Sequence, residues 1–193
     1  MNFLQKIRTR IGYYFLNKGI SSLSRNKKLV NINSAGSVGV LFELTDESVY
    51  YSIQKYFQKL QEKKIKVKAL GFASNKHVTN HFLPVLAFDF FDGKQLNWFY
   101  IPKATCVQDF MDADFDICIN IASENVFPLK YIAGLSNARL KVGAYGKDMP
   151  GQKYKELSSI YDIMLLAEEN HNQIVFLDQI HDYLTILNPK KNG

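Results

Sequence analysis

The strongest constraint on the fold is a repeated alternation of short apolar segments with amphipathic helical segments. Residues 37–44 form a short apolar run rich in branched residues, and the spacing of Val49, Ile53 and Leu60 then marks one face of a helix that runs to about Lys64. Further strand-like segments lie at residues 65–72, 85–91, 115–122, 139–144 and 161–167. Strands that alternate with helices are joined by right-handed crossovers, which produce a mostly parallel sheet covered on both faces. The sequence therefore predicts one three-layer α/β domain, flavodoxin-like or Rossmann-like.

The chain begins with a segment of helical periodicity. Between residue 3 and about Lys18, apolar residues recur every three or four positions, which places them on one side of a helix that we expect to end at Gly19. This apolar stripe contains Phe3, Leu4, Ile7, Ile11, Tyr14 and Phe15. Residues 21–35 have little periodicity and read as a connector. We therefore predict an N-terminal amphipathic basic helix and connector at 1–35, an α/β domain at 36–188 and a tail at 189–193.

Positive charge is concentrated at this end of the chain. The formal net charge is +6, yet the first acidic residue is Glu43, and the residues after the connector are close to neutral. The basic residues of the first thirty are Lys6, Arg8, Arg10, Lys18, Arg25, Lys27 and Lys28. A basic segment on a neutral body is typical of a docking element for an anionic partner.

The first functional hypothesis is therefore a non-enzymatic binding protein that docks through these basic residues. The partner would be the inner membrane surface or RNA and the ribosome, and the apolar stripe favours a membrane or a protein groove over RNA alone. The alternative is that the helix packs on its own domain. No apolar segment is long enough to span a bilayer, so we expect a cytoplasmic protein, with a peripheral position on the inner membrane if the helix is an anchor.

The second hypothesis is a small-ligand-binding or enzymatic domain. Ligands of open parallel sheets bind beyond the carboxyl ends of the strands, where the expected loops are 43–48, 73–75, 123–125 and 145–147. The polar side chains expected there as ligand contacts are Thr45, Ser123, Glu124 and Asn125. The same residues also suit helix capping, which is the competing interpretation.

No cofactor or metal is predicted. The chain has no G-x-G-x-x-G and no Walker A motif, and Asp46 and Glu47 stand where an anion would bind. His77 and His81 are four residues apart but lack a third ligand at a diagnostic spacing. Cys106 and Cys118 do not form a disulfide framework or a zinc pattern.

Two other clusters have both a functional and a structural interpretation. The acidic residues Asp109, Asp112, Asp114 and Asp116 suit a cation site or a solvated helix end. Residues 97–102 contain the only tryptophan, Trp98, within an aromatic cluster. This cluster suits stacking on a base or a sugar, or a loop held to the core by its aromatic rings.

Several of these segments carry a resemblance to known families. The segments SVGVLFELTDE, KVKALGF, LNWFYIP, FDICINIA and PLKYIAGLSNARLKVG together resemble a family of uncharacterised proteins from the Bacteroidota, a domain of unknown function. That resemblance implies one compact domain in a bacterial cytoplasm and no particular activity. Residues 114–143 are also similar to the N-terminal half of heptosyltransferase-type glycosyltransferases, in which a second domain holds the nucleotide-sugar donor. For this chain, that similarity implies a reduced glycosyltransferase-like fold.

Overall fold

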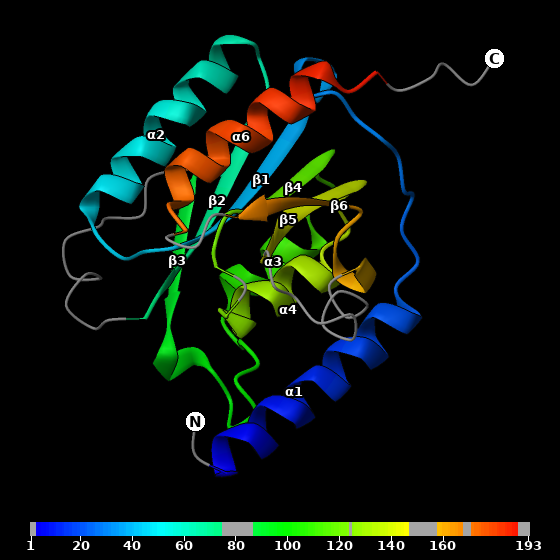
Figure 1. The fold of residues 1–193 in the computed structure, drawn as a ribbon, viewed down its shortest axis with the longest axis vertical. Helices are drawn as coiled ribbons and strands as arrows, with labels where there is room; N and C mark the ends of the chain where they lie inside the picture. The colour runs from blue at the N-terminus through cyan, green and yellow to red at the C-terminus, as the bar shows by residue number, and fades with distance from the viewer. Residues whose placement is uncertain (1–2, 75–86, 124, 147–157, 168–170, 189–193) are drawn as a thin grey trace.

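The structure is a computed structural model, which describes residues 3–74, 87–123, 125–146, 158–167 and 171–188. Its centre is a six-stranded parallel sheet with the strand order β3-β2-β1-β4-β5-β6 (Figure 1). The strands are β1 (Ser37–Glu43), β2 (Lys66–Ala73), β3 (Phe88–Asp92), β4 (Ile117–Asn120), β5 (Leu140–Gly146) and β6 (Ile163–Ala167). This is the strand order of dinucleotide-binding Rossmann sheets, in which the chain starts in the middle and reverses direction after the third strand.

Helices cover both faces of the sheet. On one side lie α2 (Glu47–Glu62) and α6 (Gln173–Ile186), and on the other lie α3 (Thr105–Asp112) and α4 (Phe127–Leu135), with α1 (Phe3–Ser22) packed outside α4 (Figure 1). Two short 3-10 helices, η1 (Ile32–Ser34) and η2 (Gly93–Gln95), complete the described elements. The prediction of a three-layer α/β domain with an N-terminal helix is confirmed, and all five strand pairings are parallel.

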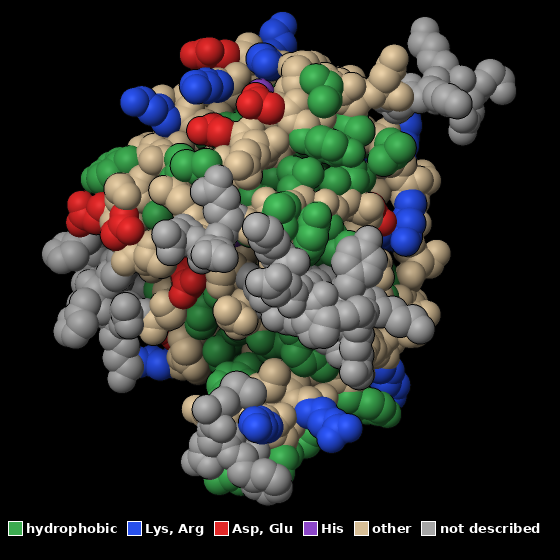
Figure 2. All heavy atoms as spheres, in the orientation of Figure 1, with side chains coloured by type: hydrophobic (Ala, Val, Ile, Leu, Met, Phe, Trp, Pro, Cys, Tyr) green, Lys and Arg blue, Asp and Glu red, His purple; other side chains and the backbone are tan. Residues whose placement is uncertain are grey.

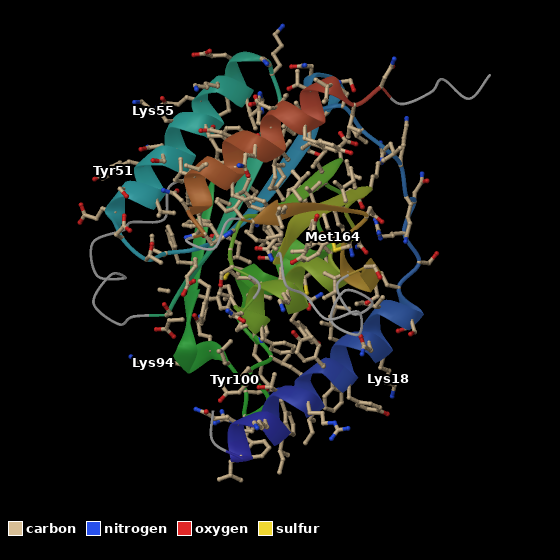
Figure 3. The ribbon with its side chains drawn as sticks, viewed as in Figure 1. Lys18, Tyr51, Lys55, Lys94, Tyr100 and Met164 are labelled. Carbon is tan, nitrogen blue, oxygen red and sulfur yellow. The ribbon has the colours of Figure 1, made fainter. Side chains whose placement is uncertain are left out.

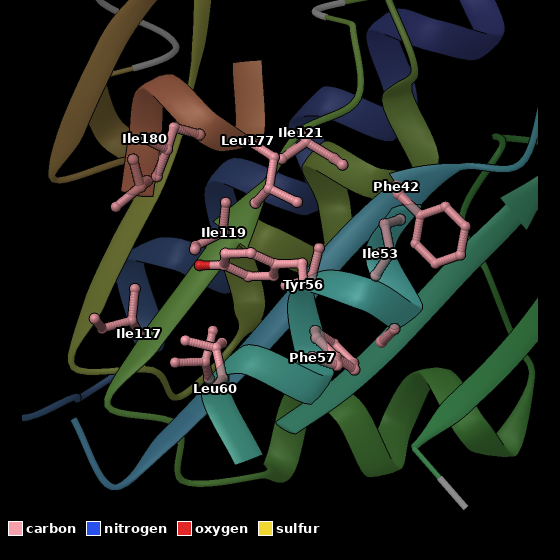
Figure 4. Packing of buried hydrophobic residues seen from close by; sticks show 14 of the residues in the cluster. Phe42, Ile53, Tyr56, Phe57, Leu60, Ile117, Ile119, Ile121, Leu177 and Ile180 are labelled. Atoms are coloured by element: carbon pink, nitrogen blue, oxygen red, sulfur yellow. The ribbon is translucent and has the colours of Figure 1, made fainter. Parts of the chain in front are cut away.

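The central strand β1 contributes side chains to two separate hydrophobic clusters. Val38, Val40 and Phe42 face α2 and α6, while Leu41 faces the side of α3 and α4. Successive side chains of a strand point to opposite faces, so β1 is buried on both sides. Figure 4 shows the first cluster, in which Phe42, the β4 residues Ile117 and Ile119, and Ile121 just after β4 lie beside apolar side chains of both helices: Ile53, Tyr56, Phe57, Leu60, Leu177 and Ile180.

Helix α1 packs on the body through small residues. Leu16 is fully buried, and a Cβ atom added at Gly134 of α4 would lie 2.7 Å from its Cδ1. A Cβ atom added at Gly12 would lie as close to Phe127 and to the carbonyl of Phe99, so a glycine on one helix makes room for a large side chain of the other. The helix also continues past Gly19 to Ser22, which corrects the expected end: the glycine lies against Leu135 and serves close packing rather than termination.

The face of α1 that packs is not the predicted apolar stripe. Within that stripe, Leu4, Tyr14 and Phe15 keep 58%, 63% and 41% of their surface exposed. Leu16 lies on a different side of the helix and anchors it to α4. Helix α1 therefore carries apolar side chains on an inner face that packs and on an outer face that is open in the described part of the chain.

The segment before β4 also differs from the expectation for it. Helix α3 was not among the elements predicted from the sequence. It is only eight residues long, and its N-cap residue, Ala104, makes no side-chain capping hydrogen bond. The segment therefore lacks both the length and the N-cap residue that would indicate a helix from the sequence.

We expect the two leucines of α1 to differ sharply in their contribution to stability. Leu16→Ala opens a cavity between α1 and α4 and should lower the free energy of unfolding by about 2–5 kcal/mol. Leu4→Ala, the matched control on the outer face, should change it by less than about 0.5 kcal/mol. Urea denaturation measures both, and similar values for the two variants would contradict the packing of α1 described here.

Candidate functional site

The candidate site is a cavity at the point where the strand order reverses. β1 connects to β2 on one side and borders β4 on the other, so the loops that follow β1 and β4 diverge and leave a crevice. A cavity of about 540 Å³ lies there. Its described lining residues come from the end of β1, from three loops, from the first two turns of α2 and from the first turn of α6: Glu43, Thr45, Asp46, Ser48, Val49, Ser52, Ser123, His171, Asn172, Gln173 and Ile174.

The first wall is the N-terminus of α2. Asp46 caps this helix, since its Oδ1 accepts hydrogen bonds from the backbone N–H groups of Ser48 (2.8 Å) and Val49 (3.3 Å). A hydrogen bond from the Ser48 hydroxyl, together with weaker contacts, holds the pKa of the Asp46 carboxyl below its ordinary value. The carboxylate therefore takes the place at the helix N-terminus that a bound anion would otherwise occupy.

The second wall is the N-terminus of α6. Asn172 caps it by accepting from the backbone N–H groups of Ile174 (3.0 Å) and Val175 (3.3 Å). The next residue, Gln173, turns its side-chain amide to the end of β1. Its Oε1 accepts from the Glu43 backbone N–H at 2.8 Å, and its Nε2 donates to the Glu43 carbonyl at 2.9 Å. Gln173 thus bonds to β1 as a neighbouring strand would and joins the two walls.

His171 fixes the third side of the cavity. Its Nε2 lies 2.6 Å from the Ile121 carbonyl at the end of β4, so this nitrogen carries the proton and donates. The ring also contacts Phe176, with the centroids 5.2 Å apart. In the neutral imidazole this arrangement leaves Nδ1 as the acceptor.

The described lining is mostly polar. It carries the carboxylates of Glu43 and Asp46 and four hydroxyl groups, and it includes no Lys or Arg. Both helix N-termini are already capped by side chains of the chain itself. Within the described ranges, no three His, Cys, Asp or Glu side chains come together in a way that would hold a metal ion. The site suits a small molecule with hydroxyl or amino groups better than a phosphate.

The structure brings together two of the four ligand contacts expected from the sequence. Thr45 and Ser123 both line the cavity. Asn125 is not among the lining residues, and its backbone N–H lies 3.4 Å from the Ser123 hydroxyl oxygen. Glu124 falls outside the described residues. The sequence interpretation missed His171 and Gln173, although Asn172, a good N-cap residue before an apolar helix, marks their loop.

The seven basic residues expected to bind a partner differ in how far contacts within the protein engage them. Arg8 and Arg25 make intramolecular contacts: Arg8 lies over the rings of Trp98 and Tyr100, and Arg25 pairs with Asp162. Lys27 lies 3.6 Å from the same carboxylate, with its side chain 69% exposed. The other four side chains are exposed: Lys6, Arg10, Lys18 and Lys28.

The two cysteines and Asp116 take part in the packing and bonding of the fold. Burial raises the pKa of the Cys118 thiol to about 11 and also raises that of Cys106, so neither favours the nucleophilic thiolate. Asp116 pairs with Arg139 and accepts from the Gly36 backbone N–H. His77 and His81 lie outside the described residues.

Comparison with known proteins supplies a family but no activity. Residues 8–187 match the model of a family of unknown function, DUF6913. The chain belongs to this family. No curated protein matches it. Within the described residues of this family member, no helix is long and apolar enough to cross a membrane.

The Gln173 bridge should stabilise this family member measurably. Gln173→Met keeps the side-chain length but leaves the Glu43 backbone N–H without its acceptor, so the free energy of unfolding should fall by about 1–2 kcal/mol. Gln179→Met, at an exposed position of the same helix, should be nearly neutral. Equal effects of the two substitutions in thermal or urea denaturation would refute a bridging role for Gln173.

Proposed function

We propose that this protein binds a small polar molecule in the cavity between β1 and β4, and that the ligand is neutral or positively charged. The observation that carries the proposal is the position of the cavity: it opens at the carboxyl ends of the two strands where the sheet order reverses. Open α/β sheets hold their ligands at this point, because helix N-termini and loops diverge there from a buried frame.

The size and rigidity of the cavity support this proposal. Its volume of about 540 Å³ lies within the range of small-molecule sites. Its walls are fixed to strand ends by hydrogen bonds, from Gln173 to β1 and from His171 to the Ile121 carbonyl after β4. A site whose walls are held in place before binding loses less conformational entropy when the ligand enters.

The charge of the lining favours one chemical class. Glu43 and Asp46 would repel a phosphate or carboxylate, while they accept hydrogen bonds from hydroxyl and ammonium groups. The hydroxyls of Thr45, Ser52 and Ser123 both donate and accept, which suits a polyol or a sugar. The similarity of residues 114–143 to heptosyltransferase-type glycosyltransferases agrees with a hydroxyl-rich ligand. We propose a bacterial cytoplasmic setting, in the Bacteroidota, on the resemblance stated above.

A pair of phenylalanine substitutions on α2 tests the site. Ser52 lines the cavity, so Ser52→Phe should fill it and abolish binding without disturbing either helix cap. Gln58→Phe adds the same ring at an exposed position of α2 and should leave binding intact. Thermal denaturation of each full-length protein is measured with monosaccharides, polyols, polyamines and nucleoside phosphates. A ligand at a hundredfold excess over Kd should stabilise the native state by about 2.7 kcal/mol.

The proposal predicts that a sugar, polyol or polyamine stabilises the wild type and Gln58→Phe but not Ser52→Phe. Stabilisation that survives Ser52→Phe would place the ligand elsewhere. Stabilisation by nucleoside phosphates alone, lost in Ser52→Phe, would keep the site but overturn the proposed ligand class.

A further inference from the structure

We propose that the outer face of α1, together with Trp98, is a docking surface for an anionic lipid bilayer. This outer α1 surface consists of the apolar residues Leu4, Tyr14, Phe15 and Trp98 and the basic residues Lys6, Arg10 and Lys18. It is independent of the proposed ligand cavity, because α1 packs on the α4 side of the sheet and the cavity is lined from the side of α2 and α6.

The apolar part of the surface consists of large side chains that the fold leaves open. Trp98 is 53% exposed, and Leu4, Tyr14 and Phe15 range from 41% to 63%. The inner face of the same helix is already occupied by the buried Leu16 and by contacts with α4. Folding of the described chain therefore uses one face of α1 and leaves the other apolar face for a partner.

The positive charge lies on the same helix and is not neutralised there. Lys6, Arg10 and Lys18 are exposed, and none of them pairs with an acidic side chain in the described ranges. No acidic residue precedes Glu43 in the chain. Figure 2 shows Lys and Arg side chains beside hydrophobic ones along the lower margin, over α1, and Figure 3 labels Lys18 toward one end of the helix and Tyr100 near the other.

The aromatic loop 97–101 extends the apolar surface beyond the helix. Arg8 donates from Nε to the Trp98 carbonyl, and its guanidinium lies 4.2 Å from the Tyr100 ring centroid. Phe15 of α1 contacts Phe99, with the ring centroids 5.8 Å apart, and Phe99 contacts Trp98, with the ring centroids 5.2 Å apart. These contacts hold the exposed indole beside α1, at the position where an interfacial tryptophan would meet lipid headgroups.

The mixture of side chains favours a bilayer over RNA. Cations alone would serve RNA phosphates, but an aliphatic side chain such as Leu4 gains free energy only when it leaves water. A helix with an apolar face and basic residues beside it lies in the interface of an anionic membrane, with its apolar side chains among the acyl chains and its cations at the headgroups. Tyr14 and Trp98 have the apolar rings and polar tips that suit the same boundary.

Fluorescence of the full-length protein tests the proposal directly, because Trp98 is the only tryptophan. Vesicles of phosphatidylethanolamine with phosphatidylglycerol should shift its emission to shorter wavelength, and brominated acyl chains should quench it. Vesicles of phosphatidylcholine alone should do neither. The shift should weaken as salt is added, because the ions screen the attraction.

Substitutions distinguish binding through the outer α1 surface from binding through the overall positive charge of the protein. The triple variant Lys6→Gln, Arg10→Gln and Lys18→Gln should lose roughly a hundredfold in affinity for the anionic vesicles. The control Lys55→Gln, Lys59→Gln and Lys66→Gln makes the same change in net charge at exposed positions away from α1, and its affinity should be close to that of the wild type. Phe15→Ser should weaken binding and Tyr51→Ser, an exposed aromatic of α2, should not. Circular dichroism checks that every variant is folded.

Four results would overturn the proposal. The first is no emission shift with anionic vesicles at low salt. The second is equal loss of binding in the α1 and control triple variants. The third is binding of poly(U) RNA that depends on Lys6, Arg10 and Lys18 while anionic vesicles compete poorly, which would assign the surface to RNA. The fourth is a dimer that buries Trp98 and is dissociated by Phe15→Ser, which would assign it to a second copy of the chain.

Discussion

The architecture follows from the need to bury both faces of an all-parallel sheet. Each strand must be followed by a crossover, and each crossover helix must cover a face that would otherwise expose apolar side chains. β1 lies in the middle of the sheet order, with strands on both sides and core clusters above and below it. Gly39 leaves room on one face for the rings of Phe110 and Phe115, which pack against the strand backbone. The remaining elements are arranged around this strand.

The same topology creates the candidate site. After β3, the chain returns to the other edge of β1 and builds β4, so the loops after β1 and β4 lead to opposite sides of the sheet. The helix ends at this crevice are capped by Asp46 and Asn172, and Gln173 closes the backbone hydrogen bonds at the end of β1. These contacts fix the walls of the cavity to the end of β1 and to the two helix caps.

The sequence predicted the elements that have a strong local signal. The strands predicted at 37–44 and 65–72 are observed as β1 and β2, because runs of branched apolar residues specify them locally. Periodicity could not choose the packing face of α1, since apolar residues lie on more than one side of the helix. The choice depends on Gly12 and Gly134, which permit close approach and are distant in sequence.

The roles of side chains that act through tertiary contacts could not be predicted from the sequence either. Thr45 and Ser123 were found because they directly follow predicted strands, whereas Gln173 reaches β1 across a large separation in the chain. Lys141, within β5, is another case. It is buried, donates from Nζ to the Gly134 carbonyl at 2.7 Å, and has its pKa lowered to about 8 chiefly by desolvation. A lysine in a strand gives no local sign that it points into the protein.

We propose that the ligand binds in the cavity where the strand order reverses, and not in another cavity of the described surface. The most direct measurement is the change in backbone amide chemical shifts of the full-length protein when a stabilising sugar, polyol or polyamine is added. The account predicts that the largest changes occur at Thr45, Ser123 and Gln173. Changes centred on Asn137 and Arg139, which line a second cavity of about 320 Å³ near the amino ends of β4 and β5, would contradict it.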